Sequence, residues 1–243
     1  MTAAAQPAWV LGTGFLGSRL RGLLPQSIGI DRAAPAEVQG DAADAAVLTR
    51  AAEVLPPALI FCCLSTRGGD TADYRHTYLD VVQALPSTAR IIFCSSLSAG
   101  QGASEKAGLL REAEQCVLSR GGVVVRLAAL YGEGRCELLR RHRAGEPRLA
   151  GAETRRLNYI HVDDAAAALL AAAEAPSGIY AACGESFTKA EAYALLEEVT
   201  GVPAAAASSP EGRRGLTDAD PAALPPVPDW QPRISFADWC RHA

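Results

Sequence analysis

Short apolar runs alternate with helix-like patterns along the first half of the chain. Residues 59–64 and 123–125 are apolar at every position, as strands covered on both faces must be. Between such runs, Leu110, Ala113 and Val117 recur at helical spacing. Alternating strands and helices imply a parallel sheet with right-handed crossovers. The pattern predicts an α/β fold, a Rossmann-type doubly wound parallel sheet, with a small C-terminal substrate lobe.

The second half of the chain predicts fewer and more irregular elements. An alanine-rich helix begins at about Asp164, and a capping box at Thr188 starts another helix. Trp230, Phe236 and Trp239 are expected to anchor the C-terminus onto the lobe. The predicted Rossmann core covers residues 1–130 and about 157–183, and the predicted lobe covers about 131–156 and 184–243.

Composition and charge exclude several classes of protein. The 243 residues are 49% hydrophobic and 21% charged, which excludes a disordered chain. The net charge of −4 and the lack of a long basic stretch argue against nucleic-acid binding. Apolar runs are too short for a membrane helix, and we expect a cytoplasmic protein without a signal peptide. The seven cysteines show no metal-ligand spacing, so no metal site is expected.

A glycine-rich motif follows the first predicted strand and opens a helix. Its residues are Gly12, Thr13, Gly14, Phe15, Leu16 and Gly17. In the G-x-G-x-x-G pattern, the glycines permit a tight turn, the approach of a pyrophosphate and close packing of helix and strand. The anion would then lie at the positive end of the helix. This context predicts a dinucleotide site.

Asp31 ends the second predicted strand, at the spacing at which an acidic residue binds a ribose. Its carboxylate would repel the 2′-phosphate of NADP, whereas the neighbouring Arg32 could pair with that phosphate. We expect NAD as the cofactor, with NADP as the alternative.

Several segments of the chain together are similar to one enzyme family. They are WVLGTGFLG, GID at the second strand, GDAAD at 40–44, the serines after the fifth strand, VVVRLAALYG at 123–132 and LNYIHVDDAAAALLAA at 157–172. Over roughly residues 8–200 the chain resembles the extended short-chain dehydrogenase/reductase superfamily, the NAD-dependent epimerase/dehydratase group. Within that group it is most similar to small atypical, YeeZ-like members.

The resemblance implies further cofactor contacts and a small-molecule substrate. Asp41 and Ala42 would lie beside the adenine, and Cys63, Leu64 and Ser65 would flank the cofactor after the fourth strand. The protein would be a monomer or a homodimer.

The catalytic residues depart from the family pattern. Ser95 or Ser96 matches the serine that polarises the substrate oxygen, but residues 97–116 contain no Tyr-x-x-x-Lys motif. If Glu114 aligns with the glutamate that usually follows this motif in the family, Lys106 occupies the tyrosine position and Leu110 the lysine position. Lys106 could act as the acid or attract an anionic substrate, or it could be a solvated helix residue.

Other polar residues have both functional and structural interpretations. Arg126 and Tyr131, at the end of the sixth strand, could contact substrate, although Tyr131 could equally hold a turn. His161, Asp163 and Asp164 resemble an acid/base cluster, but we expect Asp163 or Asp164 to cap the next helix.

Tyr74, His76 and Tyr78 lie on the helix after the fourth strand, whose start borders the cofactor cleft in this family, and are candidate substitute donors. Tyr74 and Tyr78 share a helix face, and packing is the favoured interpretation for them. Two functional hypotheses follow from the whole sequence. The first is an oxidoreductase or epimerase-like enzyme that binds NAD(P) and acts on a small polar substrate, for example a nucleotide sugar. The second is a catalytically inactive dinucleotide-binding sensor or regulatory protein.

Overall fold

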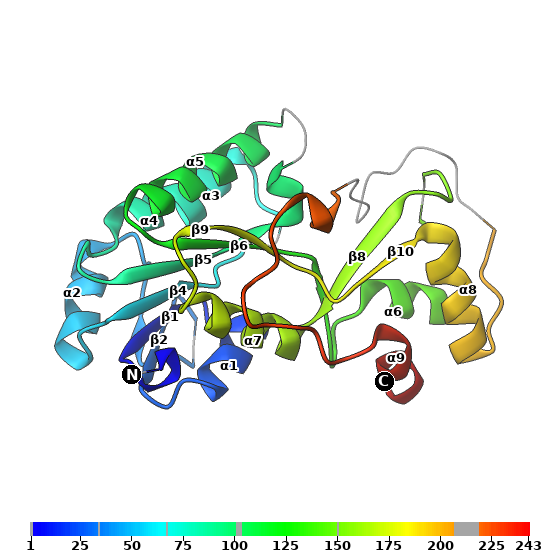
Figure 1. The fold of residues 1–243 in the computed structure, drawn as a ribbon, viewed down its shortest axis with the longest axis horizontal. Helices are drawn as coiled ribbons and strands as arrows, with labels where there is room; N and C mark the ends of the chain where they lie inside the picture. Colours follow the sequence, from blue (N-terminus) through cyan, green and yellow to red (C-terminus); the bar gives the residue numbers. More distant parts are fainter. Residues whose placement is uncertain (1, 34, 67, 101–103, 150, 207–218) are drawn as a thin grey trace.

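The computed structural model describes residues 2–33, 35–66, 68–100, 104–149, 151–206 and 219–243. It contains a seven-stranded sheet in the order β3-β2-β1-β4-β5-β6-β9 and a three-stranded sheet in the order β10-β8-β7 (Figure 1). The large sheet comprises β1 (Ala8–Leu11), β2 (Ser27–Asp31), β3 (Val38–Gln39), β4 (Leu59–Cys62), β5 (Arg90–Ser96), β6 (Val123–Leu127) and β9 (Gly178–Ala182). The small sheet comprises β7 (Ala129–Tyr131), β8 (Arg156–His161) and β10 (Glu185–Thr188).

Helices connect these strands and cover both faces of the large sheet. The α-helices are α1 (Phe15–Gly22), α2 (Ala45–Val54), α3 (Thr71–Tyr74), α4 (Val81–Ala84), α5 (Glu105–Ser119), α6 (Glu137–Arg143), α7 (Val162–Ala172), α8 (Lys189–Thr200) and α9 (Phe236–His242). The shorter helical segments are η1 (Ala3–Ala5), the π-helical η2 (Arg75–Asp80), η3 (Leu97–Gly100) and η4 (Pro221–Ala223).

The predicted doubly wound sheet is confirmed. All pairings within the large sheet are parallel, and the strand order reverses direction beside β1. Val10 packs into a core with α1 and α7, whereas Trp9 faces the opposite core with α2 and α5. Each inner strand therefore buries both faces, which explains its continuous apolar sequence.

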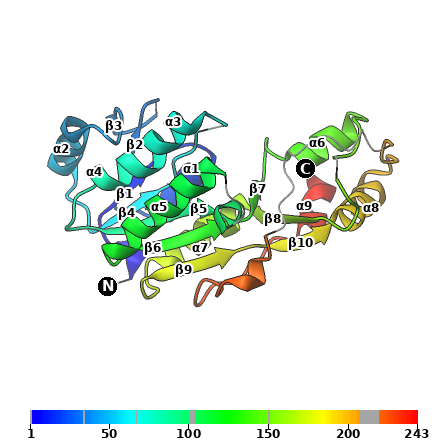
Figure 2. The ribbon, with the colours of Figure 1, turned by 90° about the horizontal axis from the view of Figure 1, so that it is seen from above.

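The small sheet and its helices form a lobe at the carboxyl edge of the large sheet. The chain passes from the carboxyl ends of β6 and β9 directly into β7 and β10, and α6, α8 and α9 surround the small sheet (Figure 2). The predicted capping box of α8 is confirmed between Thr188 and Glu191. Tyr131, Leu196 and Phe236 are buried in the core of the lobe.

The C-terminal segment connects the large sheet to the lobe. The backbone N–H of Ala181 in β9 donates to the carbonyl of Pro225 at 2.9 Å. Further on, the indole of Trp230 donates to the carbonyl of Asp164 at 3.1 Å. Phe236 and Trp239 of α9 then pack on the ring of Tyr131, with centroids 5.0 and 5.2 Å away. The predicted anchoring of the C-terminus on the lobe is confirmed for these two aromatic residues.

The start of α7 differs from the prediction. The expected capping by Asp163 or Asp164 is wrong, because His161 is the N-cap and its Nδ1 accepts from the N–H of Asp163 at 3.2 Å. Asp164 is buried, and its Oδ2 accepts from the N–H groups of Arg233 and Ile234 at 3.1 and 2.9 Å. Its carboxylate holds the C-terminal segment rather than the helix end.

Within the residues that the structure describes, no helix combines the length and the apolar character needed to cross a membrane.

Candidate nucleotide site

The glycine motif forms a tight turn between β1 and α1. Gly12 has a φ of +84°, and a Cβ atom there would lie 2.8 Å from the carbonyl oxygen of Cys63. A Cβ atom on Gly17 would overlap the carbonyl oxygen of Gly12. Both positions therefore require glycine for reasons of backbone geometry and packing.

Gly14 differs from the other two glycines of the motif. It is the N-cap of α1, and a Cβ atom there would meet no atom within 4 Å. The space in front of the turn is therefore open, and a glycine cap provides no side chain to bond the first N–H groups of the helix. A helix N-terminus of this kind attracts an anion. The turn thus offers a cradle that fits a pyrophosphate.

Asp31 at the end of β2 is tied to this turn. Its Oδ2 accepts from the backbone N–H and the hydroxyl of Thr13 at 2.7 and 3.2 Å, and its Oδ1 accepts from the N–H of Ala33 at 3.1 Å. Burial alone would raise the pKa of Asp31, but these hydrogen bonds outweigh it and hold the pKa below its ordinary value. Asp31 is therefore an ionised carboxylate beside the glycine turn, while Arg32 is exposed next to it.

A pocket opens beyond Asp31, between the loop after β3 and the helix that follows β4. It is lined by Ile30, Arg32, Gly40, Asp41, Ala42, Leu64, His76, Thr77 and Val81. The structure thus brings together Asp41, Ala42 and Leu64, which the sequence predicts to flank the cofactor. Sequence reasoning considered His76 only as a substitute proton donor on the helix that borders the cofactor cleft. It assigned no role to Thr77 and Val81, because nothing local relates these residues to Asp41. Their position becomes apparent only from the packing of the helix.

The other residues expected after β4 lie at the edge of the glycine turn. The N–H of Cys63 donates to the carbonyl of Leu11 at 2.8 Å, and the Cys63 backbone packs on Gly12. Burial raises the pKa of the Cys63 thiol well above its ordinary value, so the thiol is an unreactive, protonated group. Ser65 follows as an exposed residue.

The two serines at the end of β5 have different surroundings. Ser95 is buried, and its hydroxyl donates to Oε1 of Glu114 at 2.6 Å. Glu114 is in turn held by Nε and Nη2 of Arg126 at 2.9 and 2.6 Å. Ser96 is half-buried, and its hydroxyl lies 2.8 Å from that of Ser98. Ser95 and Arg126 both bond Glu114 inside the protein. Of the two serines, Ser96 is therefore the better placed to reach a ligand.

Lys106 and two tyrosines come together near the start of α5. The ammonium of Lys106 donates to the carbonyl of Gly69 and lies 5.0 Å from the ring centroid of Tyr74. The ring of Tyr74 packs edge-on against Tyr78 at 5.3 Å. Burial raises the pKa of Tyr78 to about 12, so its phenol is protonated at neutral pH. The phenol can donate a hydrogen bond, but the raised pKa makes it a weaker acid than an ordinary tyrosine.

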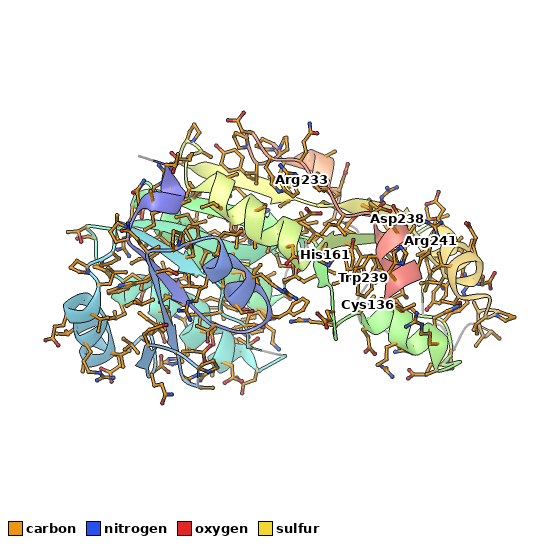
Figure 3. All side chains as sticks on the ribbon, turned by 90° about the horizontal axis from the view of Figure 1, so that it is seen from below. Cys136, His161, Arg233, Asp238, Trp239 and Arg241 are labelled. Atoms are coloured by element: carbon orange, nitrogen blue, oxygen red, sulfur yellow. The ribbon has the colours of Figure 1, made fainter. Side chains whose placement is uncertain are left out.

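Tyr131 and His161 lie at the junction of the large sheet and the lobe. The Tyr131 hydroxyl donates to the carbonyl of Ile234 at 3.1 Å, and its ring contacts those of His161 and Trp239 at 5.2 Å. His161 and Trp239 lie near each other at this junction (Figure 3). These contacts give Tyr131 a structural position inside the lobe. Among the described residues, no group of three or more His, Cys, Asp or Glu side chains is arranged to hold a metal ion.

The chain is similar to known proteins in its fold, and no similarity was found at the level of sequence families. No family model matches the sequence, and no curated protein matches it. Among solved structures, the UDP-glucose 4-epimerase of Thermotoga maritima, crystallised with UDP-glucose, has a TM-score of 0.75 at 17% identity, covering 97% of this chain and 96% of that chain.

Two further structures of the same kind contain NAD. The dTDP-glucose 4,6-dehydratase of Bacillus anthracis in complex with NAD has a TM-score of 0.78 at 14% identity, covering 98% of this chain and 95% of that chain. The UDP-glucose 4-epimerase of Thermus thermophilus in complex with NAD has a TM-score of 0.73 at 19% identity, covering 97% of this chain and 96% of that chain. The chain therefore has the Rossmann-like fold of NAD-dependent epimerases and dehydratases.

Proposed function

We propose that the chain binds NAD at the carboxyl edge of the large sheet. It uses NAD as an epimerase- or dehydratase-like oxidoreductase that acts on a small polar substrate of the nucleotide-sugar class. The observation that carries this proposal is the open glycine turn at Gly14 with the ionised carboxylate of Asp31 bound beside it. Structural neighbours of this chain bind NAD and UDP-glucose, which supports the choice of cofactor and substrate class.

The described residues offer a place for the pyrophosphate and the adenosine half of the cofactor. The N-terminus of α1 would hold the pyrophosphate, Asp31 a ribose, and the pocket at Asp41 the adenine. Asp31 disfavours the 2′-phosphate of NADP, so NAD is the proposed form. When bound, NAD supplies a nicotinamide ring that accepts a hydride and returns it.

Among this chain's own residues, Ser96 is the proposed contact for the substrate oxygen. Its hydroxyl stands at the carboxyl end of β5, where ligands bind in open α/β sheets. Lys106, fixed beside Tyr74, would place a positive charge near an anionic substrate.

A dinucleotide-binding sensor without turnover is the second candidate. A specific observation favours it, because Ser95 and Arg126 both direct their polar groups to the buried carboxylate of Glu114. Two of the residues that the sequence suggested for substrate contact therefore have internal partners.

The test is to incubate the purified protein with NAD and a panel of UDP-hexoses that begins with UDP-glucose, following NADH absorbance and sugar products. The enzyme hypothesis predicts product formation that falls at least tenfold in Ser96→Ala, because a positioned polar group is lost. NAD binding without turnover on any sugar would favour the sensor. Failure to bind NAD would reject both.

A further inference from the structure

His76 and Asp41 are joined across the pocket that lies beyond Asp31. Nε2 of His76 lies 2.8 Å from Oδ2 of Asp41, while Oδ1 of Asp41 accepts from the N–H of Ala43 at 2.9 Å. Each carboxylate oxygen is thus bonded from one side, and each retains a lone pair for a further donor. The Asp41 side chain is held in one orientation by two donors from different elements.

The pocket around this pair suits a flat aromatic base. Its walls include the apolar side chains of Ile30, Leu64 and Val81, and the carboxylate of Asp41 is a polar acceptor on its lining. A nucleotide base buries its faces against apolar side chains and is identified by a few polar groups at its edge. An anionic acceptor at that edge favours a base with an amino group over one with a carbonyl.

The helix that carries His76 is distorted at this place. η2 is π-helical, and the N–H of Val81 donates to the carbonyl of His76, five residues earlier. Both ends of this wide turn, His76 and Val81, line the pocket. π-Helical turns are rare and are often found at functional sites. The wide turn thus lies at the point of the helix where His76 faces Asp41.

The charged groups around His76 support the same arrangement. Asp80, on its own helix, lies 3.7 Å from Nδ1, and Arg32 lines the pocket and interacts with Asp41. Burial alone would raise the pKa of Asp41, but the hydrogen bonds from His76 and Ala43 outweigh it and keep the pKa below its ordinary value. Asp41 is therefore an ionised acceptor at neutral pH.

We propose that His76 is the positioning residue that fixes Asp41 to accept a hydrogen bond from the 6-amino group of adenine. The inference rests on the proposed NAD site, which already places the adenine at Asp41, and adds to it the residue that orients the Asp41 carboxylate.

The test compares the affinities for NAD and for nicotinamide hypoxanthine dinucleotide, which has a carbonyl in place of the 6-amino group. Isothermal titration would be performed on the wild-type protein, His76→Leu, His76→Gln and the exposed neighbour Arg75→Gln. The wild type and Arg75→Gln should prefer NAD by about tenfold or more, the size expected for a hydrogen bond to a charged group. His76→Leu should lose most of this preference, and His76→Gln, which retains an N–H donor, should restore part of it.

Each outcome decides a separate question. If the wild type binds neither dinucleotide, the proposed function fails. If it binds both equally, Asp41 does not recognise the amino group and the inference is overturned.

The variants test the role of His76. If His76→Leu is folded by circular dichroism and discriminates as well as the wild type, His76 is not the positioning residue. If His76→Leu does not fold, His76→Phe, which fills a similar space without an N–H donor, takes its place and should lose the preference that His76→Gln retains in part. A His76→Gln variant without preference, beside a normal Arg75→Gln, would contradict the role of the N–H donor.

Discussion

Gly14 and Gly17 of the glycine turn differ in the space available to a side chain. Gly17 packs against the carbonyl of Gly12, so a methyl group there has no space. Gly14 faces open space, so a methyl group there would meet only a ligand. Folding therefore requires a glycine at position 17, whereas at position 14 the requirement for glycine comes from ligand binding.

Substitution by alanine at these two glycines should separate stability from binding. We expect Gly17→Ala to lower the free energy of unfolding by several kcal/mol, about the cost of overpacking a core, whereas Gly14→Ala should fold normally. Gly14→Ala should nevertheless weaken NAD binding about tenfold or more, because its methyl group would occupy the cradle of the pyrophosphate. Urea unfolding and NAD titration measure the two effects. Equal stability losses in both variants would contradict this interpretation of the turn.

His161 provides a pH-dependent term in stability. Burial lowers its pKa below the ordinary value of 6.5, and the nearby Asp163 and Asp164 offset this only in part. The unfolded chain thus binds a proton more readily than the folded one, so stability falls as the pH drops from about 6.5 toward the folded pKa. His161→Asn retains a capping side chain but does not titrate. We expect a shallower loss of stability for this variant between neutral and mildly acidic pH, measured by urea unfolding. An identical pH profile would refute the assignment.

At the scale of elements, a buried charge network joins β5, α5 and β6. Glu114 is 1% exposed and accepts from both Ser95 and Arg126. A buried charge that loses its partner is costly, because neither water nor another group compensates it.

Glu114→Gln should therefore lower the free energy of unfolding by about 3–5 kcal/mol, since it leaves Arg126 without its carboxylate. Glu137→Gln, which interrupts an ion pair with Arg140 on the surface of α6, serves as the matched control and should leave the free energy of unfolding nearly unchanged. Urea unfolding of both variants measures the difference. A small loss of similar size in both would show that the buried network contributes little.

The sequence predicted the elements whose signals are local. Apolar strands covered on both faces, the turn from Gly12 to Gly17 and the capping box at Thr188 all depend on residues close together in the chain. The pairing of Ser95 with Glu114 and that of Asp41 with His76 join residues 19 and 35 positions apart, so no local pattern encodes them. The small sheet was missed for the same reason, because β7, β8 and β10 come from three separate segments.

At the scale of the whole molecule, the C-terminal segment fastens the lobe to the large sheet. It pairs with β9, is held by Asp164 at the start of α7 and ends in α9 on the lobe (Figure 1). Phe236 is fully buried there, stacked on Tyr159 at 5.0 Å.

Phe236→Ala should lower the free energy of unfolding by about 3–5 kcal/mol, as expected when a buried aromatic ring leaves a cavity. Leu23→Ala, at a residue that is 41% exposed, is the control and should change stability little. Thermal unfolding followed by circular dichroism measures both. Equal melting temperatures for Phe236→Ala and the wild type would show that α9 does not stabilise the lobe.

The central claim is that the carboxyl edge of the large sheet is a dinucleotide site. The most direct measurement is isothermal titration of the purified protein with NAD, NADH, NADP and NADPH, beside Gly14→Ala and Asp31→Ala. We predict micromolar binding of NAD or NADH, weaker binding of the phosphorylated pair, weakened binding in Gly14→Ala and a reduced preference for NAD in Asp31→Ala. Failure of the wild-type protein to bind any of the four dinucleotides would contradict the claim.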